Sequence, residues 1–164
     1  MIEAKRVARV LACAAFLLIW RSALAFPPTL AEDEAPEDIA RSHGDVVWLD
    51  FWASWCVPCR HSFPWMSAMQ QKYGPLGLTV VAVNLDSDRA DADRFLASMP
   101  AGFKVQFDPE GKLAKRYEVE AMPSSYVLDR TGHVIERHLG FKGSKEAKYE
   151  ASIRTALGLE AELP

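Results

Sequence analysis

Two continuous apolar stretches dominate the hydrophobic pattern of the chain, at residues 46–53 and 78–85. Both are rich in β-branched and aromatic residues and contain few polar positions. Runs of this length are typical of strands that are covered on both faces of a sheet. We therefore predict two neighbouring parallel strands joined by a helical crossover.

Helical spacing of apolar residues follows the first strand and returns near the end of the chain. Residues 59–73 carry apolar side chains on one helical face, and Gly74-Pro75 follows as a helix end. A final helix is predicted to open at Ser144 and to stop near Gly158. Its buried face is expected to contain Tyr149, Ile153, Ala156 and Leu157.

The segment between the second strand and Pro123 is too long to be a turn. Its pattern predicts a helix over residues 88–99 that is capped by Ser87, a strand over residues 103–107 and a short helix over residues 113–117. The remaining strands are expected to form an antiparallel hairpin, residues 126–128 pairing with residues 134–138.

The start of the chain has the pattern of an export signal. Basic residues precede an apolar run over residues 10–20, which is well short of the roughly 20 residues that span a bilayer. Ala23-Leu24-Ala25 then supplies a small-residue cleavage pattern. We predict a signal peptide over residues 1–25, with an uncleaved anchor as the alternative, then an acidic lead-in over residues 26–45 and one domain over residues 46–164.

The balance of acidic and basic residues limits the classes of partner that the chain is expected to bind. The chain has 19 Lys and Arg against 22 Asp and Glu. Residues 1–25 hold four of the basic groups and one acid, so 15 basic residues then face 21 acidic ones and the net charge is about −6. This balance does not suggest nucleic acid or anionic lipid as a partner.

Two cysteines, Cys56 and Cys59, remain after the predicted cleavage, because Cys13 lies in the apolar run of the signal. A structural staple closing so short a loop would remove little entropy from the unfolded chain. A metal site would need ligands besides the two cysteines, and the four histidines do not fall in a ligand pattern. We expect these histidines on the surface or in loops: His43, His61, His133 and His138. A redox pair is the third interpretation.

The surrounding pattern favours the redox interpretation. The predicted strand feeds directly into the predicted helix, so Cys56 is expected at a helix N-terminus, where unpaired amides and the helix dipole stabilise a thiolate. Cys59 follows one turn later, placed to close a ring with Cys56. Pro58 lies in the first turn, where its missing amide proton costs little.

These residues resemble a known family. WASWCVPC, with Leu49-Asp50-Phe51 before it and Pro64 after it, looks like the active-site segment of thioredoxin-fold proteins, and residues 121–128 look like their cis-proline segment. The exported TlpA and ResA type resembles the chain most. The resemblance implies an α/β thioredoxin fold, a central mixed sheet flanked by helices, with a TlpA-type inserted helix and strand before a cis bond at Pro123.

Two positions depart from the pattern. Many ResA-type proteins have a glutamate three residues after the second cysteine, where this chain has Ser62. Asp50 instead stands six residues before Cys56, as a buried acid does in thioredoxin. If buried, Asp50 would have a raised pKa and could take the proton that Cys59 must lose; the alternative is a residue that merely caps or pairs near a strand end.

The resemblance implies thiol-disulfide exchange, in which Cys56 attacks a partner disulfide and Cys59 resolves the intermediate. Trp55, Pro58 and Met122 would contact the substrate. No cofactor or metal is implied beyond the redox-active cysteine pair. The expected partners are disulfide-containing exported proteins, of the cytochrome c maturation or copper-site assembly type, and a membrane electron donor of the thiol-disulfide type. The resemblance favours a protein-disulfide reductase in the periplasm or another extracytoplasmic compartment. A thiol oxidant that forms disulfides and a non-catalytic partner-binding module are the alternatives.

Overall fold

The computed structural model describes residues 39 and 44–159, which belong to one unit over Asp33–Pro164. The predicted signal peptide over residues 1–25 and most of the predicted lead-in lie outside the described residues. Within them, no helix combines the length and the apolar character that crossing a bilayer requires. The described part is built on five strands, β1 (Val46–Trp52), β2 (Leu78–Asn84), β3 (Lys104–Phe107), β4 (Ser124–Leu128) and β5 (Val134–Leu139).

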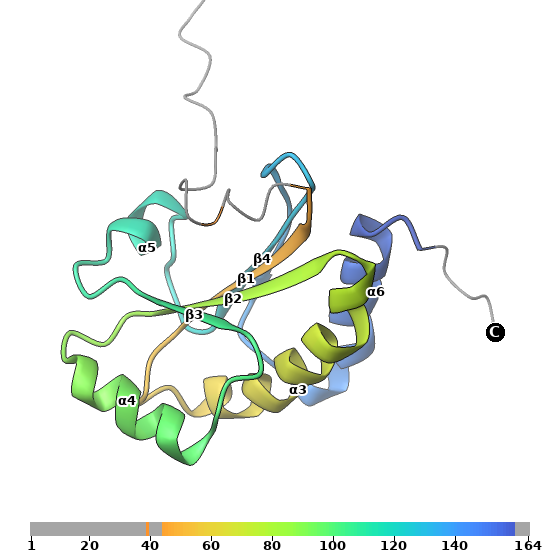
Figure 1. The fold of residues 1–164 in the computed structure, drawn as a ribbon. Helices are drawn as coiled ribbons and strands as arrows, with labels where there is room; N and C mark the ends of the chain where they lie inside the picture. The colour runs from red at the N-terminus through yellow and green to blue at the C-terminus, as the bar shows by residue number, and fades with distance from the viewer. Residues whose placement is uncertain (1–38, 40–43, 160–164) are drawn as a thin grey trace, which may run out of the picture. The chain divides into compact units, whose positions relative to one another are not determined.

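The strands form one mixed sheet in the order β3-β2-β1-β4-β5 (Figure 1). β1 pairs in parallel with β2, and β2 with β3, because a helical crossover separates the members of each pair. β4 is antiparallel to both β1 and β5, and a short turn at Asp129–Gly132 closes the hairpin. The predicted mixed sheet and hairpin are confirmed.

Helices cover both faces of the sheet, which is why β1 and β2 are buried along their whole length. Alternate residues of β1 enter two separate clusters. Trp48 and Trp52 face α3 (Val57–Tyr73), α4 (Arg89–Ser98) and α6 (Glu146–Ala156). Leu49 and Phe51 face the opposite way, toward α5 (Lys112–Arg116) and Ile39. Ile39 lies within the predicted lead-in, yet it is buried in this second cluster.

Helix starts differ from the sequence predictions by a few residues. α3 begins at Val57, two residues before the predicted start, and a 3-10 turn at Gly74–Leu76 follows it. Asp88, not Ser87, caps α4, because its carboxylate accepts a hydrogen bond from the Ala90 amide. Ser144 lies in a separate 3-10 turn, Gly143–Lys145, and α6 begins only after it.

The prediction that the histidines lie on the surface or in loops is wrong for His138. This residue is buried on β5, where its ring stacks on Trp48 with the ring centroids 5.5 Å apart. His61 and His133 are exposed as expected. His43 lies outside the described residues.

Candidate active site

Cys56 and Cys59 form a disulfide at the N-terminus of α3. Cys56 is the N-cap residue, and its Sγ accepts a hydrogen bond from the Cys59 amide at 3.3 Å. The chain arrives from the buried end of β1 through residues 53–55, which turn tightly enough for the Cys56 amide to donate to the Ala53 carbonyl at 3.1 Å. Pro58 lies in the first turn of α3, as the sequence predicts.

The two sulfur-bearing residues differ in accessibility. Cys56 is 4% exposed and Cys59 is fully buried, so a second protein can approach the disulfide only at Cys56. Its neighbours Trp55 and Val57 are 69% and 63% exposed, which gives the accessible sulfur an apolar rim. Pro58 is also exposed. Only one end of the disulfide is therefore open to exchange.

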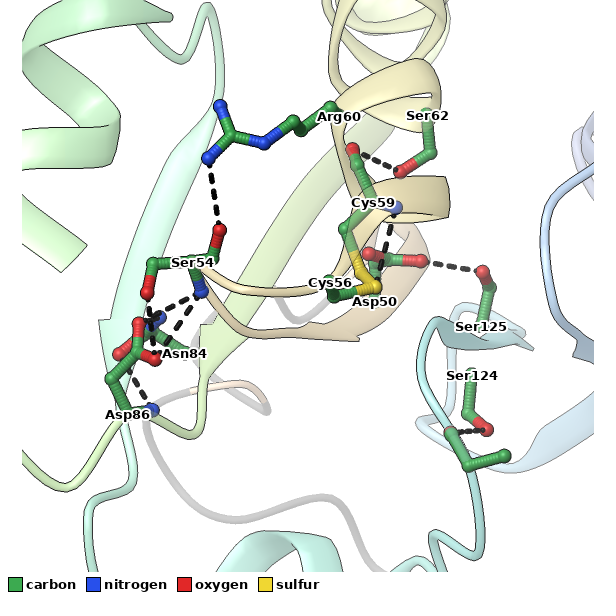
Figure 2. The surroundings of a disulfide bond; sticks show 11 residues. Asp50, Ser54, Cys56, Cys59, Arg60, Ser62, Asn84, Asp86, Ser124 and Ser125 are labelled. Atoms are coloured by element: carbon green, nitrogen blue, oxygen red, sulfur yellow. Dashed lines mark hydrogen bonds between the residues drawn. A yellow bond between two sulfur atoms is a disulfide. The ribbon is translucent and has the colours of Figure 1, made fainter. Parts of the chain in front are cut away.

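Asp50 is buried within β1 on the side that faces α3, between Trp48 and Trp52. Figure 2 shows its carboxyl group behind the disulfide, toward Ser125. Ser125 lies opposite Asp50 in the β1–β4 pairing, and its hydroxyl donates a hydrogen bond to Asp50 Oδ1 at 2.6 Å. Burial raises the pKa of Asp50 from 3.8 to about 7, and the Ser125 hydrogen bond works in the opposite direction.

Unpartnered polar atoms gather on this face of β1. Among the described residues, Asp50 Oδ2 and the indole nitrogens of Trp48 and Trp52 have no hydrogen-bond partner. Buried polar groups without partners are costly, and natural structures usually hold them where function or buried water requires it. Asp50 is therefore buried and has a raised pKa, and no donor among the described residues binds its Oδ2 atom.

The peptide bond between Met122 and Pro123 is cis. Pro123 is buried, and its carbonyl accepts a hydrogen bond from the Gly140 amide at 2.8 Å. Met122 is half-buried and packs against the cluster that contains Cys56 and Cys59. The structure thus brings the two sequence-distant motifs together at one end of the sheet.

Ser62, where many ResA-type proteins have a glutamate, is buried one turn beyond Cys59. Its hydroxyl donates to the Cys59 carbonyl at 3.0 Å, a local bond within the helix. This side chain supplies no acid or base near the disulfide, which leaves Asp50 as the buried carboxyl group on the β1 side.

A polar network that the sequence analysis missed holds the loop before Cys56 (Figure 2). The amide of Ser54 donates to both carboxylate oxygens of Asp86, at 3.2 and 3.0 Å, and the Ser54 hydroxyl donates to Oδ1 at 3.0 Å. Asn84 completes the network, since its side-chain amide nitrogen donates to Asp86 Oδ2 at 2.7 Å. Ser54 and Asp86 are 32 positions apart, so no local pattern signals the contact.

Arg60 holds the same loop from the other side. Its Nη2 donates to the Ser54 carbonyl at 3.1 Å, and its guanidinium lies 4.8 Å from the centroid of the Phe95 ring. Both the amide and the carbonyl of Ser54 are therefore fixed. Across residues 39 and 44–159, no group of three or more His, Cys, Asp or Glu side chains is placed to hold a metal ion.

Comparisons with known proteins agree with this geometry. The Redoxin family matches residues 22–153 of the chain. The thiol-disulfide oxidoreductase ResA of Bacillus subtilis (strain 168) is 26% identical over 139 residues, which cover 77% of this chain and 78% of that protein. A ResA protein of Bacillus cereus is 31% identical over 97 residues, which cover 59% of this chain but only 56% of that protein. For such relatives, little more than half of the protein is matched.

Solved structures with the same fold include a Chlorobium tepidum protein provisionally described as the thiol:disulfide interchange protein DsbE. It is 51% identical to the chain and has a TM-score of 0.72, with 73% of this chain and 85% of that chain covered. StoA from Bacillus subtilis is 24% identical with a TM-score of 0.58, covering 66% of this chain and 83% of that chain, and supports the fold alone.

The family match covers most of the chain, and the Chlorobium tepidum structure agrees with it over most of its own length. The resemblance predicted from the two motifs is confirmed. This chain belongs to the Redoxin family and is a thioredoxin-fold protein of the TlpA and ResA type.

Proposed function

We propose that the protein is a thiol-disulfide oxidoreductase that reduces disulfides of partner proteins. The observation that carries this proposal is a disulfide at the N-terminus of a long helix with only one accessible sulfur. After reduction, the helix N-terminus favours the thiolate form of Cys56, the form that attacks disulfides. A purely structural staple would not need an exposed apolar rim around one of its sulfurs.

The reaction runs in two exchange steps. The Cys56 thiolate attacks a substrate disulfide, which forms a mixed disulfide and releases the first substrate thiolate. Cys59 then loses its proton and attacks Cys56 Sγ, which re-forms the Cys56–Cys59 bond and releases the second substrate thiolate. The substrate gains two electrons and, from solvent and protein, two protons, while the protein is oxidised. Because Cys59 is buried, a substrate disulfide cannot reach it directly, so Cys59 acts only in the second step.

Asp50 is the proposed acceptor of the Cys59 proton. Its pKa of about 7 leaves it about half ionised near neutral pH, so it can accept a proton and return it to solvent. The support is its position on the face of β1 that packs toward α3, together with an oxygen that has no partner among the described residues. The alternative is that Asp50 only pairs near a strand end, through its hydrogen bond from Ser125.

The substrate would bind across the apolar rim. Trp55, Val57 and Pro58 surround Cys56 on the helix side, and Met122 with the cis-Pro123 segment lies on the other. A large exposed aromatic side chain supplies contact area at low entropic cost, which suits a surface that must accept an extended peptide. These are the proposed substrate-binding residues.

The same proposal includes the location of the protein, its partners and the redox direction of the exchange. The predicted signal over residues 1–25 and the ResA and DsbE names of its relatives favour an extracytoplasmic location. There the protein would reduce exported substrates, of the cytochrome c maturation or copper-site assembly type. A membrane electron donor of the thiol-disulfide type would regenerate it, with no further cofactor.

The reduction potential of the Cys56–Cys59 pair tests the proposal. Titration against dithiothreitol or glutathione, followed by the fluorescence of Trp52 and Trp55, should give a value near or below about −220 mV. A value near −120 mV would favour the disulfide-forming oxidant. A pair that never equilibrates would favour the non-catalytic binding module.

Trapping separates the roles of the cysteines. Cys59→Ser should accumulate a mixed disulfide with a reducible substrate, whereas Cys56→Ser should form none. Equal trapping by both variants would contradict the assignment of Cys56 as the nucleophile.

A further inference from the structure

A small pocket of about 240 Å³ opens beside the active-site loop, between that loop and α4. Ser54, Trp55 and Arg60 line it from the loop side, and Asp91, Arg94 and Phe95 line it from α4. Trp55 immediately precedes Cys56, so the pocket adjoins the accessible sulfur. It is more polar than the apolar rim, and the exchange chemistry described above makes no use of Arg60 or α4.

Arg60 enters this pocket with its guanidinium already oriented. Figure 2 shows the side chain running from α3 back to the Ser54 carbonyl, which accepts its hydrogen bond at 3.1 Å. The ring of Phe95 supports the guanidinium at 4.8 Å. A guanidinium carries five N–H donors in a fixed fork, so the single bond to Ser54 leaves donors for a ligand. A preoriented fork loses little entropy when it binds a carboxylate.

Among the charged residues that line the pocket, Arg60 is the cation that is not paired with a lining carboxylate. Arg94 is paired with Asp91 one turn away on α4, so these two side chains neutralise each other. Asp86 lies behind Ser54, buried and already bound by the hydrogen bonds of the loop network. The chain as a whole carries a net charge of −3, which makes an arginine without a carboxylate partner beside Cys56 distinctive.

We propose that this pocket binds a carboxylate side chain of the polypeptide substrate, with Arg60 as the recognising group. The inference rests on the proposed thiol-disulfide exchange and assigns a substrate class to it. An arginine can bind a carboxylate through two parallel hydrogen bonds, which fixes the orientation of the bound segment. Because Trp55 lines the pocket and immediately precedes Cys56, the acidic residue would lie within a few residues of the attacked cysteine.

Model peptides provide the test. Each peptide carries one cysteine as a mixed disulfide with 2-mercaptoethanol and one variable residue, placed in turn at each of the nearby positions. At low salt, the best glutamate peptide should be reduced with a kcat/KM about two- to fivefold above that of its glutamine counterpart, the range expected of an exposed ion pair. A lysine at that position should slow the reaction. High salt should remove the difference.

Three substitutions locate the effect within the pocket. In Arg60→Gln the glutamate-to-glutamine ratio should fall to about one. In Asp91→Asn it should rise, because Arg94 loses its partner and becomes a second cation for the ligand. Arg89→Gln is the matched control: Arg89 is on the same helix but pairs with Asp93 and does not line the pocket, so the wild-type ratio should remain.

The ratio within each variant is independent of any general loss of activity. Equal reduction of glutamate and glutamine peptides by the wild-type protein would overturn the carboxylate pocket while leaving the exchange function intact. A ratio that survives Arg60→Gln would overturn the role of Arg60. If none of the peptides is reduced, the proposed function fails and the pocket assignment fails with it.

Discussion

Two buried aspartates lie near the disulfide, and their surroundings differ sharply. Asp86, just beyond β2, is 6% exposed and accepts hydrogen bonds from the Ser54 amide, the Ser54 hydroxyl and the Asn84 side chain. Asp50, within β1, is 1% exposed and accepts one hydrogen bond, from Ser125, while its second oxygen has no partner among the described residues. Burial is similar, but the number of donors is not.

The comparison shows that the donors around a buried carboxyl group, more than its burial, decide what it can do. A carboxylate with several donors stabilises the structure that supplies them, and Asp86 holds the loop that leads to Cys56. A carboxyl group with one donor in a dry environment changes its protonation near neutral pH, as the pKa of Asp50 indicates. One acid is suited to positioning and the other to proton transfer.

The largest expected effect comes from Asp50→Asn. The Asp50 pKa is about 7 in the folded state against 3.8 for the free group, so the folded protein holds this proton while the unfolded chain releases it. Wild-type stability should therefore fall as the pH rises from about 4 to 7 and level off above that. Above pH 7 the variant should be more stable by about 4 kcal/mol, since each pKa unit corresponds to about 1.4 kcal/mol.

Urea unfolding of the oxidised protein between pH 5 and 8 measures this difference. The Asp50→Asn variant should lack the downward slope in this interval. A variant with the wild-type slope would show that Asp50 is not the group that holds the proton. The same variant should also slow the second exchange step, which stopped-flow fluorescence of the mixed disulfide can follow.

Asp86→Asn should destabilise the protein, whereas Asp50→Asn should stabilise it. An amide in place of the carboxylate would point a donor toward the Ser54 amide or the Asn84 side chain, and at least one buried donor would lose its acceptor. The expected loss is about 2 to 3 kcal/mol of unfolding free energy, measured by urea unfolding. If Asp86→Asn stabilised the protein as Asp50→Asn is expected to do, the contrast between the two acids would be wrong.

Ser125→Ala should sharpen the comparison by removing the single donor of Asp50. Loss of this hydrogen bond should raise the pKa of Asp50 further, because the bond favours the ionised form. Loss of a hydrogen bond worth about 1 kcal/mol should lower the ionised fraction of Asp50 at pH 7 about threefold and slow the second exchange step by a similar factor, with the midpoint of its pH profile moved upward. Ser125→Thr keeps a hydroxyl and serves as the control. An unchanged pH profile in Ser125→Ala would separate Ser125 from the proton-transfer step.

Ser54→Ala should have the smallest effect of the set. It removes the hydroxyl bond to Asp86 Oδ1 but keeps both bonds from the Ser54 amide. We expect a loss of about 0.5 to 1 kcal/mol in unfolding free energy and a reduction rate within about twofold of wild type. A loss as large as that of Asp86→Asn would mean that the hydroxyl, and not the backbone, carries the network.

The sequence was informative where the fold imposes a local pattern. β1 and β2 are covered on both faces, so each produced a continuous apolar run that could be assigned without tertiary information. The cysteine motif and the cis-Pro123 segment are local as well. Their meeting at one end of the sheet followed from the family resemblance, because nothing in the spacing alone sets the distance between them.

Contacts that depend on strand register or on the competition between adjacent residues could not be predicted. The Ser54–Asp86 network joins residues 32 positions apart and needs the exact ends of β1 and β2. Ser87 and Asp88 are both good capping residues, and the path of the chain after β2 decides between them. His138 is polar on a partly exposed strand, yet stacking on Trp48 covers it.

The burial of Cys59 also has a consequence for accidental adducts. Within the Cys56–Cys59 pair, a small thiol can be attached only at Cys56, next to the buried second thiol that removes such adducts. We expect the reduced protein to clear a glutathione adduct within itself, and the Cys56–Cys59 pair to accept one bulky alkylating label rather than two. The protein would thus release low-molecular-weight thiols from Cys56 without help from another protein. Long-lived mixed disulfides would form only with polypeptides that also bind the exposed surface around Cys56.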